Sequence, residues 1–370
     1  MRHNGYKMSK VLSIHYLRGL AAISVVAFHL RSTLDNTYAQ KDLGQLLFSH
    51  GNAGVDLFFI ISGFIIALST SRKYVNNKLD FVFKRIFRIY PVLLVTLVSL
   101  FFIMPDPDIL NYLRSSIPLH LDYSKGAPFF GYNSVITAWT LTYELYFYFI
   151  FLISMSISHK YRTYICSSIL FITIFSTQLY FNRNINLSGF ASIKNISDSF
   201  LNNFLRFSSS PMMIEFIYGM FLYEVRALFK RIPLANILVF TLISYFVCSY
   251  LSGYRELYGP TNYGTWGMAL FIAAITYESK YGIKESRVLS FLGDISYSLY
   301  MVHIFVINLF ILHLRELPIY ASTSGFSRVL FFISVSIILS YFVYVTIEKP
   351  FIKLGKMIMS RRVASHENLT

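Results

Sequence analysis

Residues 11–30 read VLSIHYLRGLAAISVVAFHL, and this apolar stretch decides the fold class of the chain. A helix of about 20 apolar residues is long enough to cross the ~30 Å hydrocarbon core of a bilayer. The stretch contains Arg18 and His29 and has no small-residue cleavage site. We therefore interpret it as a retained membrane span and not as a signal peptide.

The composition extends this interpretation to the whole chain. The 370 residues are 55% hydrophobic and only 14% charged, with a mean hydropathy of +0.53, whereas soluble domains are usually about a quarter charged. These values exclude an ordinary water-soluble globule. The chain is predicted to be an all-α, polytopic membrane helical bundle. We expect an integral-membrane domain over residues 1–360 and a short cytoplasmic tail over 361–370.

About ten apolar segments between turn and charge signals are predicted to span the membrane. The links on one side of these segments contain roughly twice as many Lys and Arg residues as the links on the other side. Because Lys and Arg are retained in the cytoplasm, both termini are predicted to be cytoplasmic. The net charge of +15 is thus an orientation signal and does not indicate nucleic-acid binding. The predicted spans are 11–30, 53–70, 86–104, 134–157, 161–181, 210–228, 233–252, 262–278, 288–313 and 328–348.

Ionisable residues inside these spans are candidate site residues, because a charge in the bilayer costs at least ~2.5–3.5 kcal/mol. Arg18 and His29 lie eleven residues apart, which is about 16 Å of helix rise and returns to nearly the same face. Asp56 is expected at a depth similar to that of His29, where a His–carboxylate pair would orient the imidazole as a general base. In the alternative interpretation, His29 is an interfacial residue and Asp56 is only a helix cap.

Other ionisable residues lie farther along the chain. Glu144 is expected near mid-bilayer and His303 deep in the ninth span, where each is either a site residue or a hydrogen-bonding partner between helices. Arg85 and Arg88 begin the third span on one helix face, and their guanidinium groups suit the oxygen atoms of a phosphate group. In the alternative interpretation, the two residues only anchor the helix at the cytoplasmic surface of the membrane, next to anionic lipid. Glu348 closes the last span and either pairs with a basic residue or marks the helix end.

Taken together, these motifs resemble the acyltransferase-3 family of ten-helix bacterial membrane acyltransferases, and the match covers most of the chain. They are residues 16–22 (YLRGLAA) followed by His29, 54–64 (GVDLFFIISGF), 85–88 (RIFR), 139–144 (WTLTYE), 296–303 (SYSLYMVH) and 347–350 (IEKP). The resemblance implies transfer of an acyl group, usually acetyl from acetyl-CoA, to a hydroxyl of a cell-envelope glycan. It also implies the stand-alone form, without the soluble esterase-like domain of some relatives.

The resemblance implies roles for individual residues. His29 matches the catalytic histidine of the family, Arg18 its charged partner, and Arg85 with Arg88 its paired arginines near the donor. The expected catalytic set is His29, Asp56 and Glu144; the donor-binding set is Arg18, Arg85 and Arg88; possible acceptor or supporting residues are Ser62, Tyr143, His303 and Glu348. An oxyanion donor is also needed, and Ser62, Tyr143 or a backbone N–H group is a candidate.

The expected partners follow from the same resemblance. They are acetyl-CoA or another acyl-CoA as co-substrate, an envelope glycan or lipid-linked oligosaccharide as acceptor, and the lipids of a bacterial inner membrane. No metal, tightly bound cofactor or nucleic acid is expected, and the two cysteines have no ligand spacing. The sequence leaves open which acyl group is transferred, which sugar and linkage position accept it, and what the oligomeric state is. It also leaves open whether transfer is direct or passes through an acyl-histidine intermediate. The alternatives are a secondary transporter or flippase of an envelope precursor, and an inactive scaffold for polysaccharide assembly.

Overall fold

The predicted all-α fold is confirmed. The computed structural model describes residues 11–71, 77–193 and 196–367, and these residues form helices, turns and loops without a β-strand. The first ten residues of the predicted membrane domain and residues 368–370 of the predicted tail lie outside the described residues.

The helices follow the predicted spans closely. Eight of the ten predicted segments coincide with helices long and apolar enough to cross a membrane. The helices are α1 (Leu12–His29), α2 (Leu43–Phe48), α3 (Gly54–Ser69), α4 (Asn77–Ile103), α5 (Ile109–Ser115), α6 (Trp139–Ile157), α7 (Arg162–Asn182), α8 (Phe200–Ser208), α9 (Met213–Glu224), α10 (Ala235–Ser252), α11 (Tyr263–Tyr281), α12 (Arg287–Leu312), α13 (Pro318–Ala321), α14 (Gly325–Val343) and α15 (Lys349–Glu367).

The other two predicted spans, 210–228 and 262–278, correspond to α9 and α11. Helix α9 has only 12 residues, about 18 Å of rise, and so is too short to cross the bilayer alone. The predicted span 210–228 thus corresponds to this short helix and the 3-10 helix that follows it (Arg226–Arg231), and it is not among the eight candidates. Helix α11 is long enough in residues but is not among the eight apolar candidates. Both helices pack against α3, so they belong to the interior of the bundle.

Two close helix contacts depend on glycine. A Cβ atom on Gly293 of α12 would lie 2.5 Å from His15 Nε2, and one on Gly19 of α1 would lie 2.8 Å from Gly293 N. A Cβ atom on Gly63 of α3 would lie 2.2 Å from the Phe216 carbonyl oxygen of α9. Small residues of this kind let membrane helices approach closely. They bring α1 against α12 and α3 against α9.

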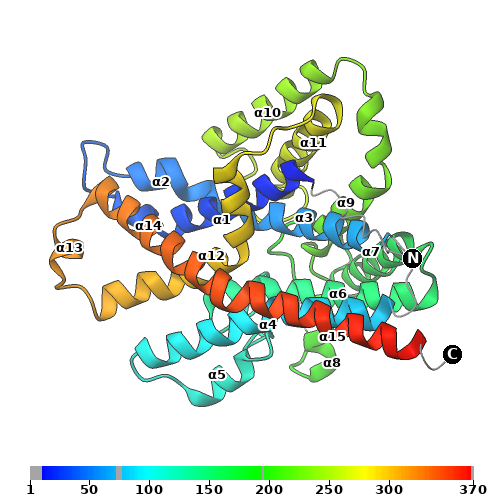
Figure 1. Ribbon diagram of the computed structural model, residues 1–370, viewed down its shortest axis with the longest axis horizontal. Helices are drawn as coiled ribbons and strands as arrows, with labels where there is room; N and C mark the ends of the chain where they lie inside the picture. The colour runs from blue at the N-terminus through cyan, green and yellow to red at the C-terminus, as the bar shows by residue number, and fades with distance from the viewer. Residues whose placement is uncertain (1–10, 72–76, 194–195, 368–370) are drawn as a thin grey trace.

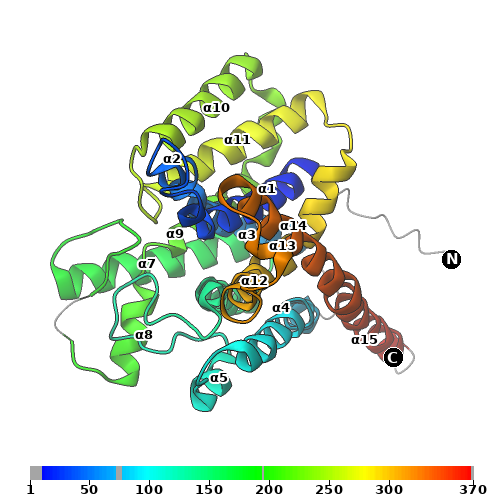
Figure 2. The ribbon, with the colours of Figure 1, turned by 90° about the vertical axis from the view of Figure 1, so that its left-hand side faces the viewer.

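Helices α1 and α3 occupy the middle of the molecule. Figures 1 and 2 show the α10–α11 pair on one side of them and α4 on the other. Helix α12 runs alongside α1 and contacts α4 and α14 as well. Because α1, α3, α4, α6 and α12 carry most of the predicted site residues, the packing of these five helices determines the site.

The C-terminal helices form a bent rod that extends beyond the bundle (Figure 2). Between α14 and α15, residues Tyr344–Glu348 form a turn of π-helix. Pro350, just inside α15, has no backbone N–H group to donate to a preceding carbonyl, and wider turns are a usual adjustment near such a residue. Glu348 therefore lies within a continuous, bent helix and does not mark a helix end.

Candidate active site

Three adjoining cavities run through the bundle. The inner cavity is bordered by His15, Arg88, Glu348 and Lys356. The central cavity is bordered by Ser62, Glu144 and Tyr148, and the outer cavity by His29, Trp139 and Tyr258. Arg18, Arg85 and Arg88 line both the inner and the central cavities, and Val55 and Tyr300 line both the central and the outer cavities. These shared lining residues show that the three cavities are neighbours, with the arginines toward one end and His29 at the other.

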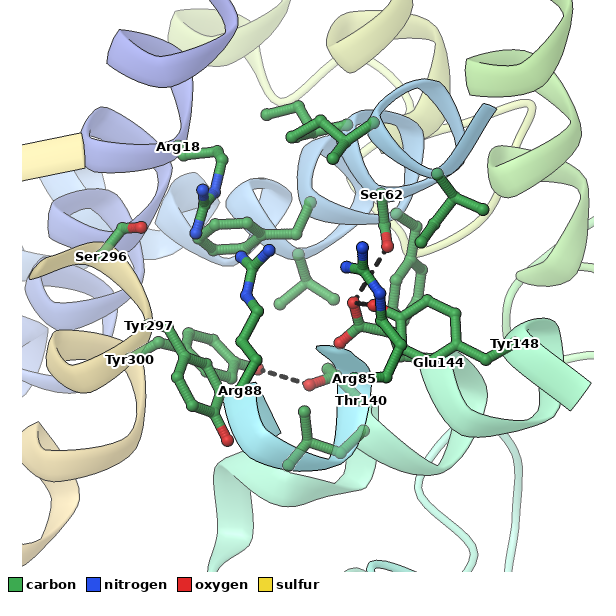
Figure 3. A pocket seen from close by; sticks show the side chains of 17 residues that line it. Arg18, Ser62, Arg85, Arg88, Thr140, Glu144, Tyr148, Ser296, Tyr297 and Tyr300 are labelled. Carbon is green, nitrogen blue, oxygen red and sulfur yellow. Dashed lines mark hydrogen bonds between the residues drawn. The ribbon is translucent and has the colours of Figure 1, made fainter. Parts of the chain in front are cut away.

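Three guanidinium groups point into the central cavity, from α1 in the case of Arg18 and from α4 in the case of Arg85 and Arg88 (Figure 3). In the described part of the chain, no carboxylate forms a salt bridge with any of them. The Arg85 Cζ atom lies 5.7 Å from the Phe81 ring centroid and 5.5 Å from that of Tyr148. Arginine groups without a carboxylate partner form a good site for an anion such as phosphate.

Glu144 faces the same central cavity. The Ser62 hydroxyl donates to Glu144 Oε1 at 3.0 Å, and the Tyr148 hydroxyl also donates to this oxygen. The structure thus brings the predicted residues Ser62 and Glu144 together with the three arginines. Glu144 does not line the outer cavity that holds His29, so it lies on the path toward His29 and not beside it.

His29, the last residue of α1, lies next to His303 of α12. Their ring centroids are 5.2 Å apart. His303 Nδ1 lies 3.0 Å from the Leu299 carbonyl oxygen, and since a carbonyl only accepts, this nitrogen carries the proton. In a neutral ring Nε2 is then an acceptor, and this buried atom has no hydrogen-bond partner within the described residues. The structure therefore joins two predicted residues from opposite ends of the sequence.

Asp56 does not form the predicted pair with His29. Its Oδ1 atom accepts a hydrogen bond from the Gly259 N–H group at 2.8 Å, and its carboxyl group lies beside the buried carboxyl group of Glu215 on α9. Asp56 is fully buried, on the face of α3 that meets α9 and the loop before α11. That placement directs its side chain away from the outer cavity.

Tyr143 and Glu348 have clear contacts. The Tyr143 hydroxyl donates to the Pro128 carbonyl oxygen at 2.9 Å, so it supports the loop before α6. Glu348 Oε2 accepts from the Ser298 hydroxyl at 2.6 Å and shares the inner cavity with Arg18 and Arg88. In the described part of the chain, no three His, Cys, Asp or Glu side chains are grouped to hold a metal ion.

Sequence reasoning missed two residues of the cavities, Tyr300 and His15. The Tyr300 hydroxyl lies 3.2 Å from both the Thr140 hydroxyl and the Thr137 carbonyl oxygen, at the junction of the central and outer cavities. His15 lies in the inner cavity, 3.1 Å from Asp294. Each lies three residues before a predicted residue on the same helix, and this spacing on one helix face is a signal that could have found them.

The chain is similar to known proteins over most of its length. Residues 11–345 match the model of a family described as an acyltransferase domain. The chain is 24% identical over 334 residues to the protein "Exopolysaccharide production protein ExoZ" of Rhizobium meliloti (strain 1021), an alignment that covers 86% of this chain and 94% of that protein. No solved structure matches the chain.

Proposed function

The chain belongs to the acyltransferase-3 family and is a multi-pass membrane acyltransferase, and on that premise we propose that it moves an acetyl group from acetyl-CoA to a hydroxyl of a cell-surface polysaccharide. The observation that carries the proposal is the series of neighbouring cavities that has three arginines toward one end and His29 at the other. A relative named for exopolysaccharide production supports a polysaccharide acceptor such as exopolysaccharide, capsule or O-antigen. The proposed location is the bacterial inner membrane.

The donor enters through the inner cavity in this proposal. The phosphates of acetyl-CoA bind Arg18, Arg85 and Arg88, whose forks match phosphate oxygens. The pantetheine arm then occupies the central cavity, where the Glu144 carboxylate accepts from an amide N–H group of the arm. This gives Glu144 a role in donor binding, in contrast to the catalytic role expected from the sequence. The thioester reaches the junction at Tyr300, next to the outer cavity.

His29 is the general base of the proposed reaction. The acceptor hydroxyl gives its proton to a neutral ring nitrogen of His29, and its oxygen attacks the thioester carbonyl carbon. The C–S bond then breaks, and the CoA thiolate takes the proton from His29. The Tyr300 hydroxyl, in place of Ser62 or Tyr143, turns its proton from the Thr137 carbonyl oxygen to the substrate and stabilises the oxyanion that forms there. Because the donor and acceptor cavities adjoin, the proposal takes direct transfer in preference to an acyl-histidine intermediate.

His303 replaces Asp56 as the residue that orients His29. The His303 ring lies next to the His29 ring, and His303 Nε2 is available to accept a hydrogen bond from an N–H group of His29. Such a contact selects the tautomer whose other nitrogen is free to take a proton. Asp56 then acts on the loop that contains Gly259 and not on the base.

Mass spectrometry of envelope glycans from cells with and without the gene product tests this function. Glycans from cells that contain the protein are expected to carry an added acetyl mass on one sugar, and loss of this mass is expected in a His29→Ala strain. Purified protein should also release free CoA when acetyl-CoA and glycan are both present. A transporter would change the location of a glycan without releasing CoA, so an unchanged acyl content would contradict the proposal.

A further inference from the structure

The outer cavity has a wall of aromatic rings contributed by separate segments. The Phe129 and Tyr132 rings are stacked, with centroids 4.6 Å apart and planes inclined by 15°. The Trp139 and Tyr258 rings meet Phe129 edge-on at 5.0 and 5.7 Å. All four side chains line the cavity that contains His29, and we call them the aromatic wall.

The loop that carries Phe129 and Tyr132 is held in an unusual conformation. Phe130, Gly131 and Tyr132 have successive φ values of 44°, 75° and 60°, a left-handed backbone that is unfavourable for residues with a side chain. The Tyr132 carbonyl oxygen accepts from the Leu121 N–H group at 2.9 Å, and Tyr143 holds the Pro128 carbonyl. A strained backbone of this kind persists only where surrounding contacts hold it in place, and such places are often binding sites.

Tyr258 is held in position from both sides. Its carbonyl oxygen accepts from the Gly189 N–H group at 2.7 Å, and the next residue, Gly259, donates to Asp56 at 2.8 Å. Gly259 has a φ of 118°, and a Cβ atom there would lie 2.4 Å from Gly189 N. The buried carboxyl group of Asp56 therefore contributes to the outer cavity by fixing the loop that presents Tyr258.

The polar groups of the outer cavity are few, and the imidazole of His29 is neutral when it acts as the base. The described lining residues include no Lys, Arg, Asp or Glu. The Thr137 hydroxyl oxygen is buried at this cavity and has no hydrogen-bond partner in the described part of the chain. A mainly apolar cavity with a few convergent polar groups suits a small uncharged ligand that has both apolar and hydroxyl surfaces.

We propose that the aromatic wall binds one neutral pyranose ring of the acceptor beside His29, an inference that rests on the proposed function. A pyranose ring presents a flat C–H face that packs on aromatic rings, and its hydroxyls reach Thr137 and His29. A lipid chain would leave the buried Thr137 hydroxyl unpaired, which costs free energy. A charged sugar would find no charged lining partner to compensate its desolvation. The ring that accepts the acyl group is thus an uncharged one.

Acceptor kinetics of the full-length protein test the wall. Tyr132 is 37% exposed, so its replacement removes little of the core. Tyr132→Ala is expected to raise the KM for the glycan roughly tenfold while the KM for acetyl-CoA stays unchanged. Tyr132→Phe keeps the ring and is expected to recover most of the glycan affinity that Tyr132→Ala loses. Tyr254→Ala, at a 52% exposed tyrosine that does not line the cavity, is the matched control. An unchanged glycan KM in Tyr132→Ala would overturn the inference.

A binding measurement tests the site without catalysis. The chain has two tryptophans, so Trp266→Phe leaves Trp139 of the aromatic wall as the fluorophore. In this variant, with His29→Ala added, we expect a saturable fluorescence change with at least one methyl glycoside of glucose, galactose or mannose. The acyclic polyol mannitol should cause none. No response to any glycoside, or an equal response to mannitol, contradicts a pyranose site.

The two measurements separate this inference from the proposed function. If glycans are acetylated normally but Tyr132→Ala leaves the glycan KM unchanged and glycosides cause no response, the aromatic wall is not the acceptor site and the acyltransferase proposal stands. If glycosides bind but no glycan ever gains an acetyl group, the pyranose site stands and the proposed function fails.

Discussion

At the scale of single residues, the two histidines of the outer cavity illustrate how packing assigns chemistry. His29 and His303 lie in different predicted spans, and their rings are 5.2 Å apart only because α1 and α12 run side by side. Asp56, the carboxylate expected to accompany His29, instead binds the backbone of Gly259. The base and its orienting residue are thus both imidazoles in the proposed site.

His29→Ala is expected to lower the rate of acyl transfer by about 10²- to 10⁴-fold, which is the usual contribution of a general base. Donor affinity should stay near the wild-type value because the arginines lie elsewhere along the cavities. Transfer of radiolabelled acetyl groups and equilibrium binding of acetyl-CoA measure the two effects. His313→Ala, at a residue outside the three cavities, is the control. Near-normal transfer in His29→Ala would remove the base from the mechanism.

Tyr300→Phe tests the proposed oxyanion donor. The substitution keeps the ring at the cavity junction and removes only the hydroxyl group, so we expect kcat to fall by about 10²- to 10³-fold with little change in either KM. Tyr143→Phe is the comparison, because its hydroxyl supports the Pro128 loop and does not line the central or outer cavity. Equal losses in the two variants, or a loss confined to KM, would argue against a role in the transition state.

At the scale of elements, helix α4 and the contact between α1 and α12 position the donor groups. Arg85 and Arg88 lie one turn apart on α4, and Arg18 approaches them from α1 (Figure 3). Figure 1 shows that α4 and α1 are separate in the chain order but enclose the same region with α12. The arginine group therefore depends on how three helices pack.

Replacement of both arginines of α4 tests the donor site. Arg85→Ala/Arg88→Ala is expected to weaken acetyl-CoA binding by about 10- to 100-fold or more, since hydrogen bonds to charged groups contribute roughly 1.5–3 kcal/mol each. Arg85→Lys/Arg88→Lys should recover part of the affinity, because the charge returns without the guanidinium fork. Arg114→Ala, at an exposed arginine of α5, should have no effect. Unchanged binding of acetyl-CoA in the double alanine variant would mean that Arg85 and Arg88 only orient the helix in the membrane.

Gly293→Ala tests the close approach of α12 to α1. The added methyl group would meet His15 at 2.5 Å, so the helices must separate. We expect a lower thermal unfolding temperature and reduced transfer, with a cost of about 1–3 kcal/mol for overpacking. Gly126→Ala adds a methyl group with no neighbouring atom within 4 Å and is the control. A thermal unfolding temperature and a transfer rate equal to those of Gly126→Ala would show that this contact does not control the site.

At the scale of the whole molecule, the three neighbouring cavities extend from a basic side of the bundle toward the aromatic wall. The basic links predicted to be cytoplasmic lie at the ends of α1, α4 and α12 that form the inner cavity, which includes Lys84 and Lys356. The aromatic wall lies toward the opposite ends, near His29. In the proposed function, a soluble donor and an envelope acceptor would meet in these cavities without either crossing the membrane.

Oriented membrane vesicles test this sidedness. With externally added acetyl-CoA and acceptor in the lumen, inside-out vesicles are expected to release CoA and acetylate the glycan. Right-side-out vesicles should do so only after permeabilisation, because their inner cavities face the lumen. Vesicles that contain His29→Ala protein supply the background rate. Equal activity of both intact preparations would contradict the predicted topology.

The sequence by itself determined the helical membrane fold, eight of the spans and the residues that line the cavities at Arg18, His29, Arg85 and Arg88. These features depend on hydropathy and on helix periodicity, which are properties of short segments. The tertiary structure alone decided that His303 lies beside His29, that Asp56 holds the Tyr258 loop, and that four of the many aromatic residues face a cavity. Such contacts join segments far apart in the chain, and they follow from close helix packing at positions such as Gly19 and Gly293, which no local pattern specifies.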